Sequence, residues 1–287
     1  MKRIIYIIIG ITACLTSYAA GFGSVKALPQ DSATICRLLA EAKKQPASTC
    51  MPLFFAQKFV GIPYVAHTLE GDKQERLVVN TRQLDCTTLV ETVTALTLCA
   101  QRKDYSWLAY QQALVGLRYR GGVINGYPSR LHYFTEWITD NTKAGVVSEV
   151  QAPNPPFTAV QTVKVNYMST HPKSYQALKE HPEYVSAIAK QERQVSGAKY
   201  RYIPKKLVGK SQMLRKAIKD GDIIAITCNK AGLDIAHLGF AVWRADGLHL
   251  LNASQLHHKV VLEPMTLYQY LKKHSSHTGI RIIRITK

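Results

Sequence analysis

Acidic side chains are scarce in this chain of 287 residues. Asp and Glu number 19 against 37 Lys and Arg, which gives a formal net charge of +18. Such an excess favours anionic partners or simply keeps the protein soluble. The basic residues are spread along the chain, and neither a zinc-finger pattern nor an RNA-binding aromatic signature is present. We therefore do not expect nucleic acid as a partner.

Long apolar runs are also lacking, with one exception at the N-terminus. Lys2 and Arg3 precede an apolar run at 4–13, and small residues suited to cleavage follow at 17–20 and at Ala27. This pattern predicts a signal peptide over 1–27 and export of the mature protein. "ITAC" also resembles a lipoprotein box, with a signal at 1–13 and lipidation at Cys14. The protein would then be peripheral to the membrane.

Cysteines are few, and their number after export is odd. Without Cys14, five remain: Cys36, Cys50, Cys86, Cys99 and Cys228. An oxidising compartment favours two disulfides and one free thiol. Cys36 and Cys50 bracket the end of a predicted helix and are a candidate pair.

Internal repeats and low-complexity tracts are absent, so we expect one domain over 28–287. Apolar periodicity predicts helices at 31–44 and 106–118 and helical segments at 172–180 and 183–195. "ERLVVNT" is expected to be a short strand. The last third contains short Ile/Val/Leu-rich runs between turn residues, including a hairpin at Asp246–Gly247. Helices early in the chain and strands in its last third predict an α+β fold, with helical additions around 28–50 and 140–200.

Cys86 stands in "QLDCTTLVETVTAL", directly after Asp85. Asp85 is a good helix N-cap, which places Cys86 in the first turn, where the helix dipole favours a thiolate. The Cys86 amide would also suit an oxyanion. A disulfide or a buried structural thiol remains the alternative.

A thiol nucleophile needs a base, and the base needs an orienting group. His237 begins the run "HLGFAVW" and shares a strand face with Gly239 and Ala241, which leave room beside it. Across the hairpin, Asn252 could hold the imidazole tautomer. A structural histidine and a strand-end turn residue are the alternatives. Four other histidines lie in polar stretches and are expected to be solvated: His257, His258, His274 and His277.

Metal-ligand spacing is missing around "HHK" at 257–259, and we expect neither a metal nor another cofactor.

Together these residues resemble the NlpC-like cell-wall cysteine peptidases. The matching motifs are Asp85–Cys86, His237–Leu238–Gly239 and the polar Asn252 on the next strand. The resemblance implies a papain-like core, in which the nucleophile helix packs on an antiparallel sheet. It also implies that Tyr64, in "GIPYVAHTLEG", borders the oxyanion.

A narrower resemblance is to N-acetylmuramoyl-L-alanine amidases that act on 1,6-anhydro-muropeptides. It is carried by "GIPYVAHTLE", "LDCTTLVETV", "RYRGGVINGYPSRLHYFTEWITDN" and "IAHLGFA". It implies a periplasmic enzyme whose partner is GlcNAc-anhydro-MurNAc-peptide. "DCTT" replaces the "DCSG" of the wider superfamily, which argues against carrying over γ-D-glutamyl specificity.

The loop 119–137 interleaves glycines, aromatic and basic residues, as a sugar-binding segment would. Within the resemblance, the substrate-binding candidates are Asp85, Tyr127, Arg130, His132 and Tyr133. Phe134 and Trp137 are equally well explained as core residues of a helix that starts near Ser129.

Two other functions compete with the amidase. A γ-D-glutamyl-diaminopimelate endopeptidase would use the same residues on another bond. A catalytically idle wall-binding module would use only the basic surface, but the Cys86, His237 and Asn252 set argues against it.

Overall fold

The computed structural model describes residues 25–72 and 74–286. The signal sequence predicted for 1–27, and the alternative lipidation at Cys14, therefore lie almost wholly outside the described residues. Within the described part, the helices are too short or too polar for any of them to cross a bilayer.

Helices dominate the first half of the chain. They are α1 (Pro29–Ala42), α2 (Met51–Lys58), α3 (Cys86–Arg102), α4 (Trp107–Arg118), α5 (Phe134–Lys143), α6 (Tyr167–Thr170), α7 (Gln176–Glu180), α8 (Tyr184–Val195), α9 (Ser211–Leu214) and α10 (Leu267–Lys272). The expected helices at 31–44, 106–118, 172–180 and 183–195 correspond to α1, α4, α7 and α8, with small shifts at their ends.

The strands form one antiparallel sheet. They are β1 (Val147–Val150), β2 (Ala159–Thr162), β3 (Lys199–Pro204), β4 (Ile223–Cys228), β5 (Ile235–Arg244), β6 (Gly247–Ser254), β7 (Lys259–Leu262) and β8 (His277–Ile285). Their order is β2-β3-β8-β4-β5-β6-β7, and β1 pairs with β8. The predicted hairpin is present, since Arg244 pairs with Gly247. A mixed fold of helices and an antiparallel sheet is thus confirmed.

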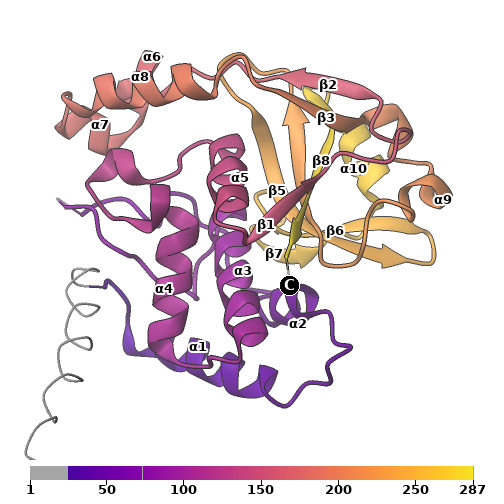
Figure 1. Ribbon diagram of the computed structural model, residues 1–287, viewed down its shortest axis with the longest axis horizontal. Coiled ribbons are helices and arrows are strands. Elements are labelled where there is room, and N and C mark those ends of the chain that lie inside the picture. The colour runs from indigo at the N-terminus through magenta and orange to yellow at the C-terminus, as the bar shows by residue number, and fades with distance from the viewer. Residues whose placement is uncertain (1–24, 73, 287) are drawn as a thin grey trace, which may run out of the picture.

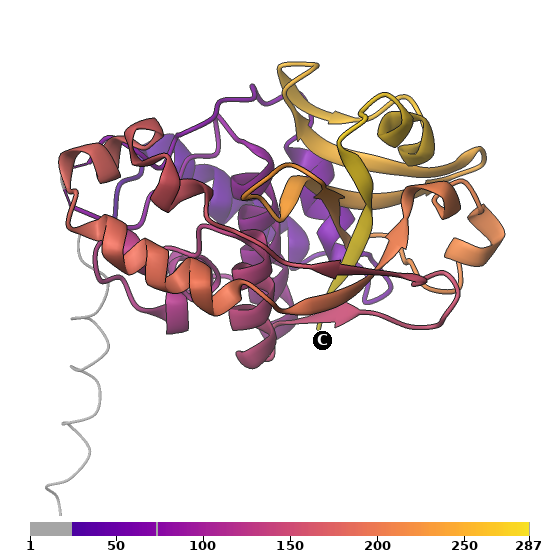
Figure 2. The same cartoon turned by 90° about the horizontal axis from the view of Figure 1, so that it is seen from above.

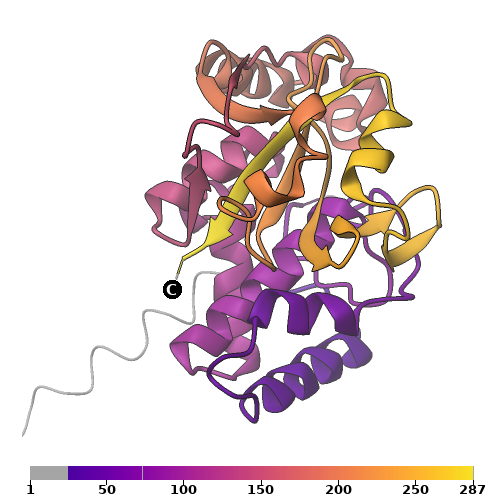
Figure 3. The same cartoon turned by 90° about the vertical axis from the view of Figure 1, so that its right-hand side faces the viewer.

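The two faces of the sheet pack against different helices because successive strand residues point to opposite sides. Ile223 and Phe240 belong to a core shared with α1 to α5, whereas Ile224 and Ala241 belong to a core shared with α9 and α10. α3 packs against α1, α2 and α4 and against β5 and β6. Figure 1 shows these helices on one side of the sheet, and Figure 3 shows α1 and α2 below it.

A third cluster lies under α6 to α8. Val163, Val165, Met168, Leu178 and Ile188 pack there against Tyr127 and Tyr133 of the loop before α5. Figure 2 shows α7 and α8 at the opposite end of the molecule from α10.

Three expectations are wrong in detail. The segment 140–200 is not only helical, because β1, β2 and the start of β3 lie within it. "ERLVVNT" makes one isolated bridge, between Lys26 and Val78, and no strand. The predicted disulfides are absent: all five cysteines of the described chain, Cys36 and Cys50 included, are free thiols.

Candidate active site

Cys86 is the first residue of α3, as expected, and Asp85 caps the helix. The Thr88 amide donates to Asp85 Oδ1 at 2.8 Å, and the Asp85 amide donates to Thr88 Oγ1 at 2.9 Å. This reciprocal capping fixes the direction in which the chain enters the helix. The Asp85 carboxylate was a candidate for substrate binding, and the structure engages it in this cap.

The Cys86 side chain is partly exposed, yet its surroundings favour the thiol over the thiolate. Burial, and then the neighbouring Asp85 carboxylate, raise the pKa of Cys86 to about 12, although the amides of Leu238 and Thr87 oppose the shift. The sequence expectation of a thiolate favoured by the helix dipole stays a prediction. The desolvation of the sulfur and the charge of Asp85 oppose that effect. Attack by this sulfur requires a group that removes its proton.

His237 and Asn252 are joined across the hairpin, as expected. His237 Nε2 lies 2.9 Å from Asn252 Oδ1. Asn252 is fully buried, and its Nδ2 donates to the Leu250 carbonyl at 3.4 Å. A carbonyl only accepts, so this contact turns the amide oxygen of Asn252 towards His237. Nε2 must then carry the proton, and Nδ1 is left as the acceptor.

The protein also keeps His237 neutral. Burial is the main cause that lowers the pKa of His237, and the hydrogen bond to Asn252 opposes it. The face that His237 shares with Gly239 and Ala241 packs towards α10, where Tyr270 lies, so the space beside the small residues is occupied by protein. Gly239 is required there, because an added Cβ would approach the Leu251 carbonyl oxygen to 2.7 Å.

A cavity of about 210 Å³ brings Cys86 and His237 together. Its lining includes three of the predicted substrate residues: Tyr127, His132 and Tyr133. An unprotonated imidazole nitrogen beside a thiol can take the thiol proton as the sulfur attacks a carbonyl. No group of three His, Cys, Asp or Glu side chains in the described chain is arranged to hold a metal.

Tyr64 lies near this pair but is not part of the cavity lining. Burial, and then the charges of Cys86 and Asp85, raise its pKa to about 12. Its hydroxyl is thus a neutral donor close to the nucleophile. Its backbone is fixed by hydrogen bonding to the His258 carbonyl at 3.0 Å.

The aromatic loop residues differ in what they offer. His132 Nε2 donates to the Tyr127 carbonyl at 3.0 Å, so Nδ1 is an acceptor, and burial lowers the pKa of His132 to about 3. The Tyr133 hydroxyl donates to Glu192 at 2.7 Å and accepts from the Met168 amide. Tyr133 therefore offers the cavity its ring, whereas His132 also offers a nitrogen.

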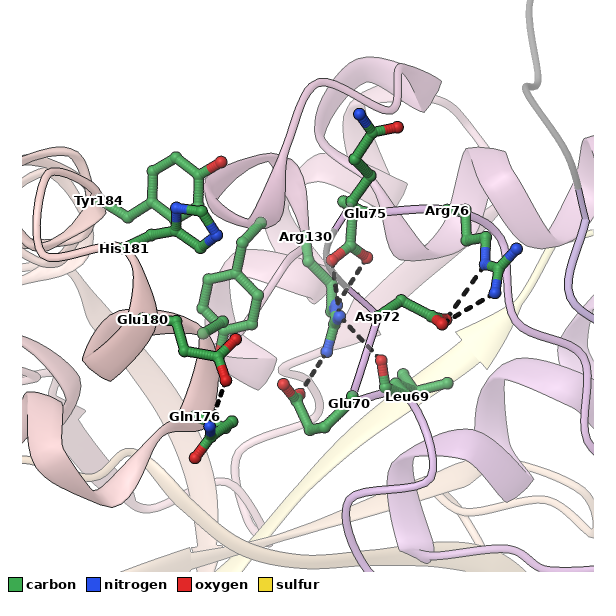
Figure 4. A pocket seen from close by; sticks show the side chains of 14 residues that line it. Leu69, Glu70, Asp72, Glu75, Arg76, Arg130, Gln176, Glu180, His181 and Tyr184 are labelled. Carbon is green, nitrogen blue, oxygen red and sulfur yellow. Dashed lines mark hydrogen bonds and ion pairs between the residues drawn. The ribbon is translucent and has the colours of Figure 1, made fainter.

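Arg130 does not line the cavity of Cys86 and His237, and its guanidinium is bound by acidic partners, which Figure 4 shows. Its guanidinium donates to Glu75 at 2.7 and 3.0 Å, to Glu70 at 2.7 Å and to the Leu69 carbonyl at 3.2 Å. These bonds anchor Leu69, Glu70 and Glu75, and Glu70 in turn lines the cavity that Cys86 and His237 share. Arg130 therefore supports the cavity indirectly, because it holds Glu70 in place. Phe134 and Trp137 are buried residues of α5, as the alternative interpretation expected.

Several lining residues were missed at the sequence level. Glu70, Met168, Tyr175 and Asp234 contribute to the cavity. Asp234 accepts from the Thr135 amide at 2.7 Å and so caps α5 across 99 residues of sequence. Such long-range contacts leave no local pattern. Tyr175 and Met168 come from the region of α6 and α7, where sequence spacing indicated only helices.

The chain as a whole is similar to proteins described as amidases. Residues 54–280 match the family model described as AmiA-like, N-acetylmuramoyl-L-alanine amidase-like. An N-acetylmuramoyl-L-alanine amidase from Bacteroides uniformis has a TM-score of 0.78 at 40% identity, covering 86% of this chain and 100% of its own. The chain belongs to this amidase-like family and is an enzyme of the amidase class.

Two further structures and one negative result complete the comparison. A Bacteroides fragilis protein provisionally named a xylanase has a TM-score of 0.75 at 42% identity, covering 80% of this chain and 99% of its own. A Legionella pneumophila protein at 22% identity has a TM-score of 0.69, covering 90% of this chain and 95% of its own. At this identity the likeness shows a common fold alone. No curated protein sequence matches the chain.

Proposed function

We propose that this protein is an exported cysteine amidase of the NlpC-like type. Its bond is the amide between the lactyl group of 1,6-anhydro-N-acetylmuramic acid and L-alanine of the stem peptide. The observation that carries the proposal is the His237–Asn252 bond of 2.9 Å at a cavity that Cys86 also lines, within a chain of the amidase-like family. The same proposal includes export of the protein to the periplasm and a papain-like core.

The reaction begins with two neutral groups. The Cys86 proton moves to His237 Nδ1 while the sulfur bonds to the lactyl carbonyl carbon, and the carbonyl oxygen takes the negative charge. The Cys86 amide and the Tyr64 hydroxyl donate to that oxygen. The carbon–nitrogen bond then breaks, and His237 returns the proton to the amine of L-alanine. Asn252 accepts from Nε2 throughout, which holds the ring and stabilises its cationic form.

A thioester between Cys86 and the muramyl lactyl group remains. Neutral His237 removes a proton from water, the resulting hydroxide adds to the thioester carbonyl, and the sulfur leaves and is reprotonated. The products are a free lactyl carboxylate and an intact stem peptide.

The products identify the bond that is cleaved. GlcNAc-anhydro-MurNAc-tetrapeptide should yield the disaccharide acid and the whole tetrapeptide, as measured by liquid chromatography with mass spectrometry. Release of a disaccharide that still carries L-Ala–D-Glu would instead assign a γ-D-glutamyl endopeptidase. Wild-type protein that releases neither product would contradict both activities, and an otherwise identical substrate with a reducing MurNAc tests the anhydro preference.

Tyr64→Phe tests the oxyanion arrangement. Loss of one oxyanion donor costs about 10² in kcat, because the bond forms fully only when the charge develops. KM should change little. Tyr268→Phe removes the same hydroxyl from a side chain on α10 that packs against Gly209 and Lys272, and it should behave as wild type. A higher KM at unchanged kcat would show that Tyr64 binds substrate instead.

A further inference from the structure

Four aromatic rings from three segments form a continuous stack that ends on His237. The centroid of the Tyr270 ring on α10 lies 6.4 Å from that of His237, with the planes 30° apart. Tyr270 also lies 4.9 Å from His274 and 6.0 Å from His277, and these two imidazoles are 4.5 Å apart. His277 begins β8, so the stack ties the base to both α10 and the middle of the sheet.

The stack is built into the fold, contrary to the expectation that His274 and His277 are solvated. Tyr270 is 6% exposed and His277 is 7% exposed. His274 Nε2 and His277 Nδ1 are buried without a hydrogen-bond partner in the described chain. Buried polar nitrogens of this kind carry a cost, and one explanation for their retention is a functional role.

The charges around the stack disfavour any imidazolium within it. Lys205 donates to the His274 carbonyl at 2.9 Å. Burial lowers the pKa of His274, and the charges of Lys205, Lys230 and Lys273 lower it further. Burial, followed by His274, His237, Lys205 and Lys230, lowers the pKa of His277 to about 4. The acidic groups are fewer: Glu263 acts on Tyr270 and His274, and Asp85 acts on His237. The rings therefore form an uncharged wall.

We propose that Tyr270, backed by His277, is a positioning residue that fixes the plane of the His237 imidazole and excludes water from one side of it. The inference rests on the thiol mechanism proposed above. The hydrogen bond from Nε2 to Asn252 leaves the ring free to rock about that bond, and Tyr270 restricts this rocking. Nδ1 is thereby held towards the cavity, where the Cys86 proton is taken. Tyr270 itself is not among the residues that line the cavity, so its role is to hold the imidazole.

The test follows alkylation of Cys86 by iodoacetamide across a pH series, with peptide mapping to separate Cys86 from the other thiols. Alkylation needs proton removal by neutral His237 but no muropeptide. Tyr270→Leu should slow it about tenfold at its optimum, because the base is misplaced. The acid limb of the alkylation pH profile should move to higher pH in this variant. Burial lowers the pKa of His237, and water that reaches the imidazole reverses this effect. His277→Leu should give a smaller change in the same direction.

Two matched variants separate positioning from packing. Tyr270→Phe keeps the ring and should retain the wild-type pH profile. Tyr268→Leu makes the same side-chain change two residues away on α10 and should also retain it. If Tyr270→Leu keeps the wild-type profile, or if Tyr268→Leu moves it equally, the positioning role is wrong. If His237→Ala is alkylated like wild type, the thiol mechanism fails, and this inference fails with it.

Discussion

Cys86→Ala should lower turnover of GlcNAc-anhydro-MurNAc-peptide by about 10⁴-fold or more, with the fold retained. Removing the nucleophile of a hydrolase leaves only the contribution of binding and of oxyanion donors, and such losses are of this size. Cys86 is at the helix start and partly exposed, so loss of its sulfur opens no enclosed cavity in the core. The measurement is steady-state product release, with the melting temperature as the check on folding.

Cys99→Ala is the matched control, because it makes the same change near the other end of α3. Cys99 is buried and lies away from the cavity lining. This variant should lose some stability and keep its kcat. Cys86→Ser retains a hydroxyl of much weaker nucleophilicity and should also be almost inactive. Turnover by Cys86→Ala within tenfold of wild type would contradict covalent catalysis by this thiol.

The centre of the site could be predicted because its members lie in local patterns. Asp85 and Cys86 are a helix start, and the turn at Asp246–Gly247 sets the register that brings Asn252 beside His237. Local pattern did not reveal the burial that opposes a thiolate at Cys86. The helix dipole is encoded near the residue, whereas the burial that raises the pKa of Cys86 comes from the packing of α3 on β5.

Contacts between distant segments also explain what else the sequence did not reveal. The acidic partners of Arg130 could not be foreseen, because Glu70 and Glu75 are more than 50 residues away in sequence. His277 looked solvated because Ser275 and Ser276 precede it, yet it is the first residue of a central strand. β1 and β2 are four-residue strands whose half-buried positions give little apolar alternation. The surroundings of each of these residues and strands are determined by contacts with a segment that is distant in sequence. The spacing of residues along the chain does not reveal such contacts.

Arg118→Met should lower the free energy of unfolding by about 3–5 kcal/mol, the largest stability effect we expect from the removal of a single buried charge. Arg118 Nε donates to Glu91 Oε2 at 2.7 Å, and its Nη1 donates to the Val78 carbonyl at 2.7 Å. The two charged side chains are 3% and 2% exposed. Removing the guanidinium leaves a buried carboxylate on α3, the helix that carries Cys86. Urea unfolding measures the loss, and the exposed Arg37→Met, which breaks a surface pair with Glu41, should cost at most about 0.5 kcal/mol.

Two further measurements show whether the unpaired carboxylate causes the loss. Glu91→Leu combined with Arg118→Met removes both charges and should recover most of the stability, as replacement of a whole buried pair often does. Burial raises the pKa of Glu91 above its usual 4.5, and Arg118 opposes that shift, so the single variant should raise the pKa further. A group with a raised folded-state pKa stabilises at low pH, and this stabilisation is lost as pH rises. The deficit of Arg118→Met should therefore shrink from pH 7 towards pH 5, and a deficit that is constant with pH would assign the loss to packing alone.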